Sequence, residues 1–85
     1  MMIMIDVMNL YVNDLVYSEV YGGCAIVSSY VHSYDKSFMC SYVWCADKRE
    51  MYSSVSVSID EIREPTYEEV CEFMRQYVPI IQSEG

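Results

Sequence analysis

Serine alternates with branched apolar residues near the middle of the chain, and this pattern constrains the fold most. Within the segment 51–59, Val55, Val57 and Ile59 alternate with Ser54, Ser56 and Ser58. A period of two places the apolar side chains on one face of a β-strand and the hydroxyls on the other. The pattern predicts a strand with one buried and one wet face, which requires neighbouring strands.

Three further segments are rich in branched and aromatic residues. The run at 38–45 is separated from 51–59 by a short polar turn. The runs 15–21 and 24–32 flank Gly22 and Gly23, a pair typical of a hairpin because both residues can adopt positive φ. In the alternative interpretation an N-terminal helix continues to Tyr21 and ends at Gly22. The sequence therefore predicts three or four antiparallel strands.

A helix is predicted at each end of these strands. Residues 3–12 are apolar except at Asp6 and Asn9, which share one helical face with Asn13. At the other end, Thr66 and Glu69 have the spacing of a capping box. The apolar stripe of this second helix comprises Val70, Cys71, Phe73, Met74, Tyr77 and Val78, and Pro79 is expected to end or kink it. The predicted fold class is α+β, an antiparallel three- or four-stranded meander flanked by an N-terminal and a C-terminal helix (αββββα or αβββα).

The length of 85 residues predicts a single domain spanning 1–85, with one core and no room for a deep cleft. The apolar N-terminal run lacks a basic flank and is interrupted by Asp6, so we expect it to be core rather than a signal or membrane segment. A cytoplasmic location follows, in the host cell if the protein is viral. The four cysteines are then expected to be free thiols.

No residue pattern predicts catalysis, a metal site or a cofactor. Cys24, Cys40, Cys45 and Cys71 include no CxxC pair. Cys40 and Cys45 are an odd number of residues apart, so a regular strand would point them to opposite faces. His32 is the only histidine, and no orienting group accompanies it. We therefore expect a protein that is not an enzyme, with buried cysteines.

The formal net charge of −8 limits the classes of partner. Five lysines and arginines cannot neutralise a phosphate backbone, so we expect no direct binding to nucleic acid and none to an anionic membrane. The complementary partner is a protein with a basic surface. The nucleic-acid grooves of other proteins are large surfaces of this kind.

The acids concentrate in the segment 60–72, where only Arg63 opposes them. Capping requires Glu69 alone, which leaves other acids for binding. Tyrosine is so abundant that some rings must reach the surface, where aromatic residues anchor partners. The predicted partner-binding residues are Asp60, Glu61, Glu64, Glu68, Glu72 and Tyr67. The alternative interpretation is an ordinary solvated helix start.

In size, charge and lack of catalytic residues the chain resembles small proteins of phages and mobile elements that block host defence, such as anti-CRISPR and anti-restriction proteins. This resemblance implies an inhibitor that imitates nucleic acid and occupies a basic groove of a nucleic-acid-handling complex. One alternative is a non-enzymatic accessory subunit or homodimer. Another is a small cysteine-dependent redox protein or enzyme.

Overall fold

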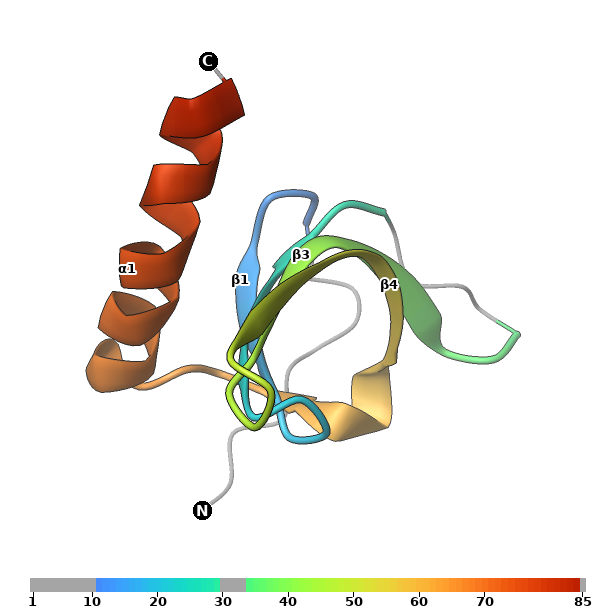
Figure 1. Ribbon diagram of the computed structural model, residues 1–85. Helices are drawn as coiled ribbons and strands as arrows, with labels where there is room; N and C mark the ends of the chain where they lie inside the picture. The colour runs from blue at the N-terminus through green and yellow to red at the C-terminus, as the bar shows by residue number, and fades with distance from the viewer. Residues whose placement is uncertain (1–10, 30–33, 85) are drawn as a thin grey trace.

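The computed structural model describes residues 11–29 and 34–84 and shows an antiparallel sheet followed by one helix (Figure 1). Strands β1 and β2 form a hairpin, and β3 and β4 form a second. A 3₁₀ turn, η2, leads into the very short β5. The elements are β1 (Leu15–Ser18), β2 (Gly23–Val27), β3 (Ser37–Cys45), β4 (Glu50–Ser58), η2 (Ile59–Glu61), β5 (Ile62–Arg63) and α1 (Tyr67–Glu84).

The sheet is curled into a partly open barrel. Its strand order is β4-β3-β2-β1-β5, so β4 and β5 lie at opposite edges. In a flat sheet those edges would be about 19 Å apart, four spacings of roughly 4.8 Å. Only η2 separates Ser58 from Ile62, and four extended steps span at most about 14 Å. The two edges must therefore curve toward one another, as Figure 1 shows for β4.

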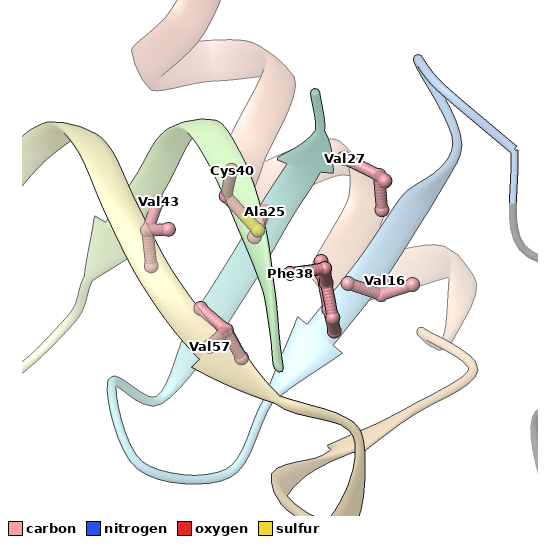
Figure 2. Packing of buried hydrophobic residues seen from close by; sticks show 7 residues of the cluster. All are labelled: Val16, Ala25, Val27, Phe38, Cys40, Val43 and Val57. Carbon is pink, nitrogen blue, oxygen red and sulfur yellow. The ribbon is translucent and has the colours of Figure 1, made fainter. Parts of the chain in front are cut away.

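The interior of this barrel is the first of two hydrophobic cores. Seven buried side chains from the four longer strands meet there (Figure 2). We call this set the barrel core: Val16, Ala25, Val27, Phe38, Cys40, Val43 and Val57. Val57 belongs to it, and Ser54 and Ser56 are exposed, so the alternation in the sequence is confirmed at the centre of β4.

The second core lies on the outside of the barrel, beneath α1. Phe73 is fully buried there together with Cys24 and Trp44. Its ring stacks on Tyr77 at 5.3 Å between centroids, and Tyr77 meets Tyr42 of β3 edge-on at 5.4 Å. The sheet is thus covered inside by its own curvature and, over part of its outer face, by α1. We call this second set the helix core.

The predicted arrangement of helices is wrong, although the α+β class is confirmed. Five strands are present instead of three or four, and the only helix of three turns or more among residues 11–29 and 34–84 is α1. The helix predicted over 3–12 lies outside the described residues except for Tyr11 and Val12. Those two are not helical and lead through a turn into β1. A sheet that closes on itself covers its inner face without a second helix.

Residues 15–21 are not helical, so the hairpin interpretation is the correct one at this position. Its turn, however, spans 19–22 rather than the two glycines. Gly22 alone has a positive φ, of 73°, whereas Gly23 is the first residue of β2.

Of the two effects expected of Pro79, an end or a kink, the end does not occur, because α1 continues to Glu84. Proline removes only one helical hydrogen bond, the one to the carbonyl of Arg75. Pro79 is exposed, so no buried group depends on that bond.

Candidate functional site

The segment from η2 to the first turn of α1, which we call the junction, contains most of the residues expected to bind a partner. This junction runs from η2 through β5 into the first turn of the helix, and in Figure 1 it crosses beneath the barrel. Its geometry shows which acidic side chains hold the fold together and which have no structural partner.

Glu69 is fully engaged in holding α1 against the barrel. Its two carboxylate oxygens accept hydrogen bonds from Nη1 and Nη2 of Arg63 at 2.8 and 2.6 Å. One of the same oxygens accepts from the Thr66 backbone N–H at 2.8 Å, and the Thr66 hydroxyl accepts from the Glu69 N–H at 3.2 Å. The predicted capping box is therefore confirmed, and it is joined to a bidentate ion pair.

Arg63 connects three elements through one guanidinium. Besides Glu69, it approaches Glu19 with Nε at 3.5 Å from the carboxylate. Its Cζ lies 3.9 Å from the ring centroid of Tyr17 on β1, a cation–π contact. The hydrogen bonds from Arg63, aided by Thr66, lower the pKa of Glu69 from 4.5 to about 2. This network is structural, so Glu69 is unavailable to a partner.

Two of the six predicted residues also have structural roles. Glu61 accepts from the Ser58 backbone N–H at 3.3 Å and completes a second capping box, at η2. Glu72 forms an ion pair with Arg75 one turn further along α1. These pairings partly neutralise or occupy the two carboxylates. The structure therefore weakens the case for Glu61 and Glu72 as binding residues.

Three acids remain without a side-chain partner among the described residues. We call them the junction acids: Asp60 in η2, Glu64 after β5 and Glu68 in the first turn of α1. All three are exposed, and Tyr67, which lies between Glu64 and Glu68 in the sequence, has 83% of its surface accessible. A hydrogen bond with the Cys71 side chain raises the pKa of the Tyr67 hydroxyl. The sequence does not show which acids are paired, because the ion pair between Arg63 and Glu69 depends on how β5 and α1 are placed in the fold.

Two of the four cysteines are deeply buried and poorly ionisable. Burial raises the pKa of Cys24 to about 11 and that of Cys40 to about 12, so both stay protonated near neutral pH. No group of three or more metal-ligating side chains occurs among the described residues, and His32 lies outside them. All four cysteines are free thiols, as expected.

The expectation that Cys40 and Cys45 face opposite sides is wrong. Ser41 is an extra residue in β3 relative to β2, since Ile26 pairs with Tyr42 while Val27 pairs with Cys40. A bulge of this kind shifts the alternation by one position. Cys40 and Val43 consequently share the barrel core, and continued alternation turns Cys45 to the same side.

Comparison with known proteins gives no guide to function: no family model, no curated protein and no solved structure matches this chain. Within the described part of the chain, no helix is long and apolar enough to cross a lipid bilayer. The functional argument therefore depends on the residues of the junction.

Proposed function

We propose that this protein is a protein–protein interaction module that docks its junction onto a basic surface of a nucleic-acid-handling complex. The observation that supports this function is the set of three exposed acids that have no side-chain partner among the described residues, two of which, Glu64 and Glu68, flank the exposed Tyr67 in the sequence. Capping and ion pairing account for Glu61, Glu69 and Glu72. They do not account for Asp60, Glu64 or Glu68.

The physics of docking fits this arrangement. Exposed carboxylates such as Glu64 and Glu68 add their fields where they lie within a Debye length of about 8–10 Å, which steers a basic partner toward them. Such charges raise association rates and select the partner, whereas an aromatic anchor supplies contact area. Tyr67 is placed to be that anchor because it contributes to neither core.

The proposed biological role is inhibition. A negative segment with an aromatic anchor competes with the phosphate backbone for a basic groove, as a nucleic-acid mimic does. Small phage and mobile-element proteins that block host defence act within the host cell, and we propose the cytoplasm as the location. The high pKa values of Cys24 and Cys40 favour this role over thiol chemistry, because a thiol nucleophile must ionise.

The test is competition for nucleic acid. Purified complexes with basic grooves, including CRISPR effectors and restriction enzymes, are loaded with labelled DNA or RNA, and displacement by this protein is titrated. For a complex that responds, the variant Glu64→Gln/Glu68→Gln should bind at least about tenfold more weakly, a change of about 1.4 kcal/mol. The affinity of the wild type should also fall steeply with salt.

The matched control removes two acids from a different place. Asp47→Asn/Glu50→Gln changes the net charge equally but acts at the β3–β4 turn, where Lys48 and Arg49 offset those acids. Its affinity should stay within about twofold of the wild type. Equal losses for both variants would reduce the effect to net charge, and an unchanged affinity for the junction variant would refute the proposed docking surface.

A further inference from the structure

Helix α1 has three faces, and only two of them have an evident role. One face packs on the barrel through Phe73 and Tyr77. At 100° per residue, a second face carries Glu68, Glu72 and Arg75 into solvent. The third face lies between these two. We call it the outer stripe, and it consists of Tyr67, Cys71, Met74, Val78 and Ile81.

The outer stripe has the spacing of a helix-packing surface. Its members follow one another at intervals of four, three, four and three residues, the repeat of a and d positions in coiled coils. On an ideal helix they fall within about 40° on either side of Tyr67. The three large apolar side chains of α1 that are exposed are Tyr67, Met74 and Ile81, seven residues apart, with 83, 41 and 39% of their surfaces accessible.

The barrel of the same chain does not cover this stripe. Phe73, which marks the direction of the barrel, points about 100° away from Met74 around the helix axis. Figure 1 shows α1 standing beside β1, with its C-terminal turns rising past the strands. An apolar row of this regularity on a helix is typical of a surface that another helix covers.

Charge decides which helix fits. On the solvated face beside the stripe, Arg75, the only base of α1, pairs with Glu72, so the uncompensated acid there is Glu68, with Glu64 preceding the helix. A second copy would bring another chain of net charge −8 against these acids. A helix with lysine or arginine along its flank would instead pair with them, as flanking charges do in helix pairs.

We propose that the outer stripe binds an amphipathic helix of the partner protein, one with apolar residues at heptad spacing and a basic flank. This inference rests on the proposed function and defines the partner element more closely. From Tyr67 to Ile81 the stripe is about 21 Å long, at 1.5 Å per residue. It therefore accommodates about two heptads of the partner helix.

The probe is a synthetic peptide of three heptads with leucine at a and d and lysine on the flanks. Two further peptides serve as comparisons, one with the same composition in scrambled order and one with glutamate on the flanks. Binding to the full chain is measured by fluorescence anisotropy. The basic heptad peptide should bind at least about tenfold more tightly than either comparison peptide.

The protein variants isolate the stripe from charge. Met74→Gln/Ile81→Gln should weaken binding of the basic heptad peptide at least about tenfold. The control Met39→Gln/Val20→Gln alters apolar side chains that are 38 and 61% exposed outside α1, and it should bind like the wild type. Circular dichroism of each variant verifies that the fold is retained.

Two results would overturn the inference. One is that Met74→Gln/Ile81→Gln binds the basic heptad peptide as tightly as the wild type does. If Glu64→Gln/Glu68→Gln still weakens binding in that case, the proposed function stands and only the inference of a partner helix on the outer stripe fails. The other is a stable dimer in light scattering that Met74→Gln/Ile81→Gln dissolves, which would identify the occupant as a second copy. If Met74→Gln/Ile81→Gln weakens binding but Glu64→Gln/Glu68→Gln does not, the proposed function is refuted instead.

Discussion

At the scale of single residues, the acids of the junction differ in what surrounds them rather than in type. Glu69 is held by a guanidinium and a helix cap, Glu61 caps η2, and Glu68 has no side-chain partner among the described residues. The hydrogen bonds from Arg63 lower the pKa of the first of these carboxylates to about 2. Substitutions of these glutamates should therefore change the free energy of folding by very different amounts.

Replacing Glu69 by glutamine should destabilise the protein in a pH-dependent way. The pKa falls from 4.5 in an unperturbed glutamate to about 2 in the fold, so the stabilisation is complete above about pH 4.5 and is lost as the pH falls toward 2. Allowing for solvent screening, we expect Glu69→Gln to cost about 2 kcal/mol near pH 7. Urea denaturation from about pH 7 to pH 3 should show this difference shrinking.

Glu68→Gln serves as the control for this experiment. Its carboxylate is exposed and unpaired among the described residues, so its unfolding free energy should match the wild type within about 0.5 kcal/mol at each pH. A difference between Glu69→Gln and the wild type that stayed constant with pH would contradict the role assigned to the Arg63 ion pair.

At the scale of elements, the β1–β2 hairpin uses its two glycines for different reasons. Gly22 has a φ of 73°, a conformation that costs other residues about 1–2 kcal/mol. Gly23 lies against β3 so closely that a Cβ would sit 2.2 Å from the carbonyl oxygen of Trp44. The first glycine is required by the backbone angle and the second by the space between strands.

Alanine substitutions should separate these two requirements. Gly23→Ala should be the more damaging, by about 3 kcal/mol or more, because the obstructing atoms belong to the backbone of Trp44 and cannot rotate away. Gly22→Ala should cost about 1–2 kcal/mol, since its Cβ would meet Ala46 at an ordinary 3.7 Å. Thermal melts of the two variants give the order, and the reverse order would show that the angle dominates over the contact.

At the scale of the whole molecule, one sheet supports two separate cores. The barrel core is enclosed by β1–β4, and the helix core depends on α1 lying over Cys24 and Trp44. Each core contains a buried thiol, Cys40 inside the barrel and Cys24 beneath the helix, where its Sγ lies 3.4 Å from the Glu69 carbonyl oxygen. The two thiols therefore report on the two layers independently.

Removing the anchor of α1 should expose one thiol and not the other. Phe73→Ala deletes a fully buried ring and should cost about 3–5 kcal/mol of helix packing. We expect Cys24 to react much faster with a thiol reagent in this variant, while Cys40 keeps the protection of the barrel. Peptide mapping after brief labelling measures both rates.

Met74→Ala is the control on the same helix, because its side chain is exposed and should leave both rates unchanged. Simultaneous labelling of Cys24 and Cys40 in Phe73→Ala would show instead that the two cores unfold as one unit.

The sequence by itself determined the features that depend on short-range periodicity. The alternation around Val57 specified β4, and the spacing of Thr66 and Glu69 specified the start of α1. The net charge can also be read directly from the residues. These features follow from the repeat of the backbone, which is the same wherever the element lies.

Only the tertiary structure decided that the sheet closes and which acidic residues are the junction acids. Strand β5 has two residues, too few to show a period, and it forms because its backbone pairs with the edge of β1. The bulge at Ser41 turned the Cys45 side chain to the other face of the sheet. Arg63 pairs with Glu69 rather than with acids that are nearer to it in the sequence. The physical reason is common to all of these: pairing depends on which distant segments become neighbours, and that is fixed only when the chain closes on itself.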